Sequence, residues 1–331
     1  MQMQILSELL FSVLAKTSCR VYWEDMLEIY TKTLKDHTFE KIEDFRNGCW
    51  VYIKEAKIDD LNLISKMTGL ELVDIKDSLD RFELPRIERI GDNIIIFIRH
   101  PSEVEHGLYT NTLTLILTHS YVIAISPDRS EIIEHLLETS TPLNVTHKIK
   151  LIVHILTKVS LEYTSNIKRV RYAILEQEKQ KKSVDTDTIS ILTKNEEVLN
   201  QYLTSLIPMN NMLKTIAEGR LISLHEKDHD SLQDLMIGFH QSQDVCAINI
   251  KSIRSLRDSY QIIFTNNVNQ TIKLLTALTI IFHIPTITAS LYGMNISIPF
   301  QTSPVAFWIV MSIILVVSFV TVLLFRRYRW L

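Results

Sequence analysis

The side chains with the most informative chemistry lie near the end of the chain, on one face of a predicted helix. They recur at alternating steps of three and four residues, a spacing that places them along a single face. Six of the seven are polar, and none has a fixed charge, which suits contact with water, with a hydrated ion or with other helices. The face consists of Asn269, Ile272, Thr276, Thr279, His283, Thr286 and Ser290, called the polar stripe below.

The stripe lies in a part of the chain that is otherwise strongly apolar. Between Lys273 and Arg326 there is no Asp, Glu, Lys or Arg. Two apolar runs there are each about 20 residues long, the length of helix that crosses a hydrocarbon core. We predict a first transmembrane helix at 269–292, an external loop at 293–304, a second transmembrane helix at 305–325 and a basic tail at 326–331.

A polar face against lipid is costly, because unsatisfied polar groups in hydrocarbon raise the free energy. The stripe therefore faces either a water-filled pore or other helices, and the residues alone favour neither. His283 has the same two readings: a ring around an ion path, or a neutral side chain bonded to a neighbouring helix. One hairpin cannot enclose a pore, so a pore would require an oligomer.

Charged and aromatic residues predict the orientation of the hairpin. Arg326, Arg327 and Arg329 follow the second run directly, and basic residues stay on the cytoplasmic side. Both termini are then cytoplasmic in a multi-pass protein of the inner (plasma) membrane. Trp308 and Trp330 suit the two lipid–water interfaces.

The segment before the hairpin divides into two parts. Within residues 1–140 the strand signals lie from about 45 to 126. They are β-branched and aromatic runs, with turns at Gly91–Asp92 and His119–Ser120 that suggest hairpins, mixed with a helical stretch at 59–80. This pattern predicts an α/β domain. Residues 141–268 have helical periodicity, with a break expected at Pro208, and form a helical and stalk region.

Composition and missing motifs exclude several classes of protein. Lys plus Arg total 35 against 38 Asp plus Glu, so nucleic acid is not an expected partner. Three distant cysteines, Cys19, Cys49 and Cys246, argue against a disulfide framework and a structural zinc site. No P-loop, G-x-S-x-G or H-E-x-x-H motif is present, so we expect neither an enzyme, an organic cofactor nor ATP-driven pumping.

The end of the first run carries a short motif, Tyr292-Gly293-Met294-Asn295. Taken alone, glycine and asparagine there are typical of an ordinary helix C-terminus. In its context, before a second apolar helix and a basic tail, the motif resembles the signature of the CorA family of magnesium channels. Pro285-Thr286, Ala289-Ser290 and the ending from Arg326 to Leu331 resemble the family too.

The resemblance implies a fold and a function. The fold would be an α/β cytoplasmic domain, a long helical stalk and two C-terminal transmembrane helices in a CorA-like homo-oligomeric channel, a homopentamer. Its cargo would be Mg²⁺, with Co²⁺ and Ni²⁺ as secondary candidates, and Mg²⁺ would also regulate it. Zinc or another transition metal is the alternative cargo, although Met294 favours magnesium. A non-conducting membrane-anchored scaffold is a more distant alternative.

The resemblance also assigns roles to residues. Gly293, Met294 and Asn295 would form the selectivity filter. Leu275 would join the stripe in lining the pore and, with Ile272, would form a narrow apolar ring. Asp77, Asp234 and Asp258 would bind regulatory Mg²⁺, for which acidic oxygens are suited. The chain departs from many members in one respect, since residues 296–304 carry no charge.

Overall fold

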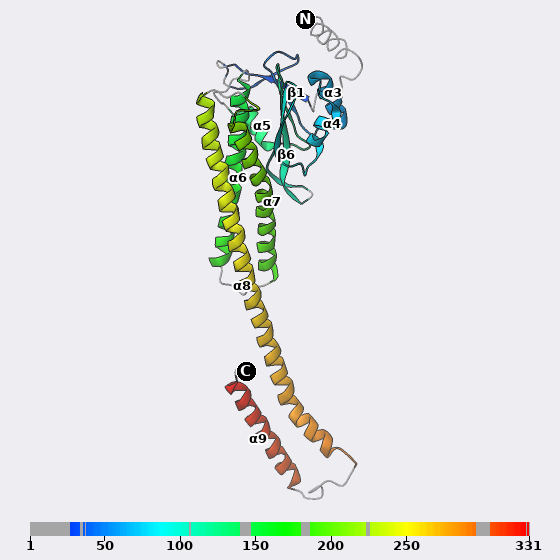
Figure 1. Ribbon diagram of the computed structural model, residues 1–331. Helices are drawn as coiled ribbons and strands as arrows, with labels where there is room; N and C mark the ends of the chain where they lie inside the picture. The colour runs from blue at the N-terminus through cyan, green and yellow to red at the C-terminus, as the bar shows by residue number, and fades with distance from the viewer. Residues whose placement is uncertain are drawn as a thin grey trace. The chain divides into compact units, whose positions relative to one another are not determined.

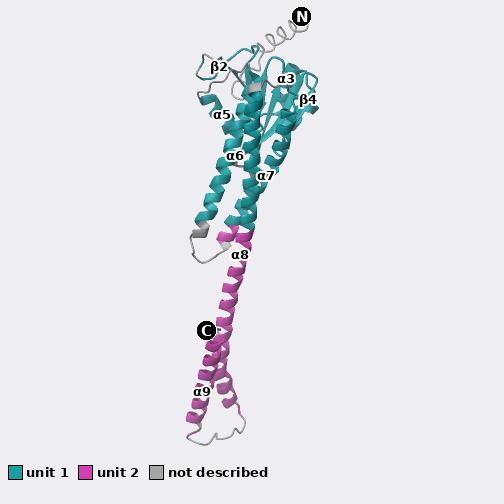
Figure 2. Cartoon of the chain, turned by 60° about the vertical axis from the view of Figure 1, so that its left-hand side comes forward, with its two compact units in different colours: residues 1–180, 191–254 teal, residues 181–190, 255–331 magenta. Residues whose placement is uncertain are grey.

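The computed structural model describes residues 27–33, 36, 38–105, 107–139, 147–179, 186–222, 226–295, 305–328 and 330. Cys19, Arg329, Leu331 and residues 296–304 of the predicted external loop at 293–304 lie outside them. The chain forms two compact units, coloured separately in Figure 2. One comprises 1–180 with 191–254, and the other comprises 181–190 with 255–331.

A seven-stranded sheet is the centre of the first unit (Figure 1). The strands lie in the order β2-β1-β3-β7-β6-β5-β4, and only β3 and β7 pair in parallel. Their bounds are β1 Leu27–Thr31, β2 Glu40–Ile42, β3 Trp50–Ile53, β4 Arg86–Ile90, β5 Asn93–Glu105, β6 Leu108–Leu117 and β7 Val122–Ile125. Both predicted hairpins are present, as β4–β5 and β6–β7.

Helices cover both faces of the sheet (Figure 1). On one face lie α3 (Ile58–Thr68), α4 (Leu72–Ile75) and the 3₁₀ turn η1 (Lys76–Leu79), which pack on alternate strand residues such as Ile95 and Phe97. The intervening Ile96 and Ile98 are also buried. Because successive strand residues point to opposite faces, this sheet is apolar on both sides and needs two covering layers. The second layer includes α5 (Glu131–Glu138) and α6 (Lys148–Lys179).

Three long helices pack around buried aromatic side chains. They are α6, α7 (Thr186–Ala217) and the first part of α8 (Glu226–Tyr292). Tyr163 of α6 is fully buried; its ring contacts Tyr202 and Phe239 with centroids 5.3 and 6.4 Å apart, and its hydroxyl donates to the Arg99 carbonyl at 3.1 Å. A Cβ on Gly238 would lie 3.1 Å from the Ser160 hydroxyl oxygen, so glycine permits the close approach of α8 to α6.

The structure corrects the sequence-based element bounds in two places. Strands β1 and β2 precede the region in which strands were expected. The expected break at Pro208 is wrong: α7 continues through it, because Leu206, Met209 and Leu213 are buried at helical spacing and outweigh the lost hydrogen bond. Helix α8 likewise continues through Gly238 and Pro285 for 67 residues, about 100 Å at 1.5 Å per residue.

The second unit contains the remainder of α8 and α9 (Ala306–Arg327). These are the two helices long and apolar enough to cross a membrane among the residues that the structure describes. In the most apolar 18-residue segment of α8, 6% of the residues are buried within the chain. In the corresponding segment of α9, 0% are buried. The apolar surface of both helices is therefore left for lipid or for other copies of the chain.

One acid in the first unit provides a test of its packing. Burial in α6, reinforced by repulsion from Glu131, raises the pKa of Glu162 to about 7 from the ordinary 4.5. The folded chain then retains a proton that the unfolded chain releases, so this group favours folding at low pH and opposes it as pH rises through about 7.

We therefore expect Glu162→Gln to gain stability relative to the parent protein as pH is raised from about 5 to about 8. The measurement is the midpoint of thermal unfolding across that range. Glu197→Gln, at an exposed position of α7, is the matched control and should show no such trend. Equal pH trends in the two variants would contradict the assignment.

Candidate functional site: the polar stripe, its exit and the regulatory acids

All eight predicted pore-lining residues lie on exposed surface of α8. They are Asn269, Ile272, Leu275, Thr276, Thr279, His283, Thr286 and Ser290. The covered positions of this part of α8 are Ala277, which is buried, and Ile281, Ile284 and Thr288, which are half-buried. At 100° per residue these four face away from the stripe. The stripe is thus a separate face of α8, and its residues are exposed within the described part of the chain.

Hydrogen bonds along the stripe run from side chains to the backbone of the same helix. The Thr279 hydroxyl donates to the Leu275 carbonyl at 2.8 Å, and the Thr286 hydroxyl donates to the Phe282 carbonyl at 2.9 Å. His283 Nδ1 lies 2.7 Å from the Thr279 carbonyl oxygen, so Nδ1 is the protonated nitrogen. These bonds satisfy the side-chain donors within the helix, and they determine which atoms the stripe presents outwards.

A hydroxyl has one proton, and a neutral imidazole has one N–H. When these protons are directed at the helix backbone, the outward atoms are lone pairs. Thr279, His283 and Thr286 therefore present hydrogen-bond acceptors over about 10 Å of helix length. Acceptors match the water shell of a cation, whose hydrogen atoms point outwards, and they match an anion's shell poorly.

The predicted filter lies at the C-terminal end of α8. The Gly293 amide donates to the Ala289 carbonyl at 2.9 Å, which continues the helical bonding past Tyr292. The backbone of Gly293 is not left-handed, unlike that of Gly69 or Gly219. A Cβ there would lie 3.3 Å from the Ala289 carbonyl oxygen, so glycine allows a close turn rather than a left-handed cap. Asn295 is exposed beyond it.

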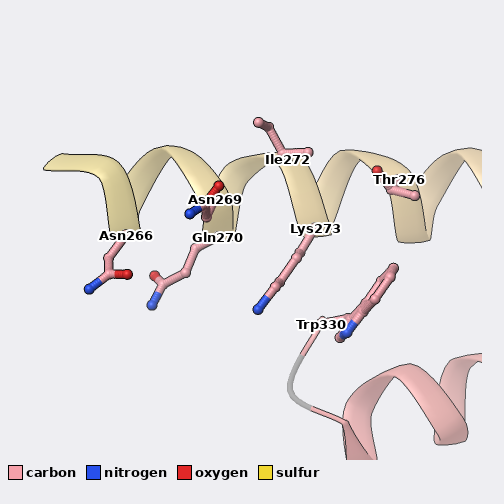
Figure 3. Close-up of a pocket in the computed structure, with 7 residues that line it drawn as sticks. All are labelled: Asn266, Asn269, Gln270, Ile272, Lys273, Thr276 and Trp330. Carbon is pink, nitrogen blue, oxygen red and sulfur yellow. The ribbon is translucent and has the colours of Figure 1, made fainter. Parts of the chain in front are cut away.

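A hollow of about 630 Å³ lies at the other end of the stripe (Figure 3). It is bounded by Asn266, Asn269, Gln270, Ile272, Lys273, Thr276 and Trp330. Figure 3 shows the side chains of Gln270 and Lys273 on the same side of α8 as the Trp330 indole. Sequence reasoning missed Asn266 and Gln270, because they lie off the heptad seam. Their signal was a local concentration of amides just before the apolar run.

The three predicted regulatory acids have different surroundings. Asp77 Oδ2 is 2.9 Å from an Arg86 amino nitrogen. Asp234 is exposed on α8. Asp258 is also exposed, with Arg257 Nε 3.9 Å away, and it borders a second hollow of about 350 Å³ together with Gln261 and Thr265. Among the described residues no three His, Cys, Asp or Glu side chains are grouped to hold a metal, so one chain does not assemble these acids into a site.

Arg86 is held by several acids at once. Besides Asp77 it bonds Glu88 at 2.7 Å and pairs with Glu83, and its guanidinium lies 4.0 Å from the centre of the Phe97 ring. Burial opposes its charge, but Glu88, Glu83 and Asp77 outweigh burial and raise the pKa of Arg86. Any cation that binds Asp77 must therefore compete with Arg86.

The fold and the stripe together define a class: a mixed α/β unit with long helices, followed by two helices that suit a membrane, the first with a polar face. Comparison with known protein families identifies the family within this class. The family model described as CorA-like Mg²⁺ transporter protein matches residues 46–327, and the chain belongs to this family.

Similarity to known relatives supports the assignment to this family. The cobalt/magnesium transport protein CorA of Methanocaldococcus jannaschii is 26% identical over 296 residues, which are 87% of this chain and 93% of that protein. The complete structure of CorA from that organism matches with a TM-score of 0.71 at 23% identity, covering 93% of this chain and 100% of that one. Full-length CmaX matches at 0.66 and 16% identity, covering 92% and 97%. These structural likenesses show a common fold.

The environment of Asp77 yields a prediction. Arg86→Gln should destabilise the first unit by about 1–2 kcal/mol, between the values of exposed and buried ion pairs, because three acids lose their partner. Mg²⁺ should then raise the midpoint of thermal unfolding more in Arg86→Gln than in the parent protein, since it can take the place of the guanidinium. Arg129→Gln, which removes an exposed pair with Glu134, is the control. An equal response to Mg²⁺ in all three proteins would refute competition at Asp77.

Proposed function

We propose that the chain is one subunit of a homopentameric channel that passes Mg²⁺ across the inner membrane down its electrochemical gradient, with both termini in the cytoplasm. Co²⁺ and Ni²⁺ are further candidate cargo. The observation that carries the proposal is an exposed stripe of acceptors that runs along the first of two apolar helices and ends at Gly293-Met294-Asn295, in a chain of the CorA family.

The stripe requires several copies of the chain to assemble. Polar groups facing hydrocarbon would be costly, and the stripe residues are exposed within the part of the chain that the structure describes. When several copies turn the stripe towards a common axis, the acceptors meet water and the apolar faces meet lipid. Helix α9 carries few polar side chains and would lie outside. At the inner end, Ile272 and Leu275 would form apolar rings able to gate by excluding water.

Selection would take place at Asn295. Mg²⁺ is small and gives up its water reluctantly, so a mouth that holds the hydrated ion avoids the cost of dehydration. A ring of amide oxygens can accept hydrogen bonds from that water without the deep binding that a carboxylate ring would produce. Gly293 lets the backbone turn closely beneath it. With no charge in 296–304, the amides act without a nearby acidic ring from that segment.

Regulation would use the same ion on the cytoplasmic side. Mg²⁺ bound between subunits at Asp77 and Asp234, with Asp258 contributing nearer the membrane, would favour the closed state when Mg²⁺ is plentiful. Arg86 would set the sensitivity, since it holds Asp77 when Mg²⁺ is scarce. Loss of bound Mg²⁺ would leave like charges facing each other and would weaken the closed arrangement.

The first test is Mg²⁺ uptake into proteoliposomes. Asn295→Ala should reduce uptake to the level of empty liposomes, because the acceptor ring at the mouth is lost, while the oligomer still assembles. Asn267→Ala is the matched control, because Asn267 is exposed on the side of α8 opposite the polar stripe, and it should conduct normally. Uptake at the parent rate by a correctly assembled Asn295→Ala protein would disprove the proposed filter.

The second test addresses regulation. Asp77→Ala combined with Asp234→Ala should require a higher Mg²⁺ concentration for protection from trypsin, since ligands of the closed state are removed. Asp92→Ala with Asp230→Ala removes two exposed acids from nearby positions and should leave protection unchanged. Protection of the first variant at the parent concentration would rule out these two acids as the sensor.

A further inference from the structure

His283 differs chemically from the other members of the polar stripe. Its neighbours offer oxygen, whereas its ring offers nitrogen. The bond from Nδ1 to the Thr279 carbonyl, 2.7 Å long, holds the ring against its own helix and places the proton on Nδ1. In the neutral ring Nε2 then has a free lone pair. The side chain is exposed within the chain, so this lone pair is open to a ligand.

The atoms around Nε2 strengthen its role as a ligand. Histidine ligands in metal sites commonly donate the other ring N–H to a carbonyl, which fixes the ring and makes the ligating nitrogen more basic. The Thr279 carbonyl provides that second partner here. Thr286, one turn further along, and Thr279 itself present only lone pairs, because their protons are bound to the Phe282 and Leu275 carbonyls. No N–H or O–H of these three side chains points towards an approaching cation.

One copy of His283 does not complete a site. No group of three or more potential ligands occurs among the described residues, and the acids of α8 all lie before Asp258 or at it. Symmetry-related copies would supply the missing nitrogens. The proposed pore, on which this inference rests, brings the same position of each subunit to the axis.

We propose that the His283 rings of neighbouring subunits form a nitrogen site in the ion path that holds borderline transition-metal ions such as Ni²⁺, Co²⁺ and Zn²⁺, and that these ions thereby block Mg²⁺ flow. Imidazole suits these metals, whereas Mg²⁺ prefers oxygen and keeps its water. Conduction requires binding weak enough for release. An ion bonded directly to several imidazoles would leave slowly, so Co²⁺ and Ni²⁺ would cross far more slowly than Mg²⁺ and hold up its flow, while hydrated Mg²⁺ would pass by hydrogen bonds.

The test measures Mg²⁺ flux into proteoliposomes against added Ni²⁺. His283→Met should need roughly tenfold more Ni²⁺ or more for half-inhibition, since loss of even an outer partner costs a metal site 10–100-fold in affinity. His240→Met is the matched control: His240 is exposed on the same helix, beside Asp244 at 3.6 Å, and could bind Ni²⁺ outside the membrane segment. It should keep the parent sensitivity. Equal Ni²⁺ sensitivity of His283→Met and the parent protein would overturn the site.

A second measurement separates this inference from the proposed function. Co²⁺ binding to the purified oligomer, followed by its visible absorption, does not depend on flux. The protein that carries His240→Met should show the nitrogen-ligand bands, and addition of His283→Met to it should remove them. Bands of equal strength in the single and the double variant would overturn the site, even if Mg²⁺ flux proved normal. Absence of Mg²⁺ flux in the parent protein would instead overturn the proposed channel.

Discussion

The structure of the membrane half depends on where a few side-chain protons go. Thr279, His283 and Thr286 donate to carbonyls of their own helix, which satisfies each donor without a partner helix. What remains outside is a row of lone pairs that hydrocarbon cannot satisfy. These bonds satisfy the side-chain donors within the helix, and they also leave one of its faces unsuited to contact with lipid. The proposed assembly around water, and the proposed preference for cations over anions, both rest on this single constraint.

The first unit is stabilised by a different interaction, the burial of both faces of its sheet. Its helices supply apolar cover, and its charged groups are arranged around a few fixed points such as Arg86. An arginine shared by Asp77, Glu83 and Glu88 is an internal counter-ion. Its charge offsets the repulsion among these three acids within the chain itself.

The sequence was most informative where a pattern extends over many residues. The two apolar runs, the hairpins β4–β5 and β6–β7 and the long helices all agree with the structure, because periodicity reports burial directly. Prediction from the sequence failed at Pro208, where the packing of α7 overrides the tendency of proline to end a helix. It also failed at β1 and β2, which are short. The stripe itself was predictable, but the direction of its hydrogen bonds was not, since spacing does not say which atom a proton bonds. The roles of the filter residues and the regulatory acids rest on the family resemblance and stay predictions.

The absence of fixed charge between Lys273 and Arg326 has a consequence for the forces on a crossing ion. Where a pore is lined by carboxylates, mobile ions screen the attraction, and conduction weakens as ionic strength rises over the range in which the Debye length shrinks from about 30 to 10 Å. Dipoles and lone pairs act only at contact, within distances too short for counterions to intervene. The proposed passage would therefore work alike in dilute and concentrated salt, and its surroundings would not screen its selectivity.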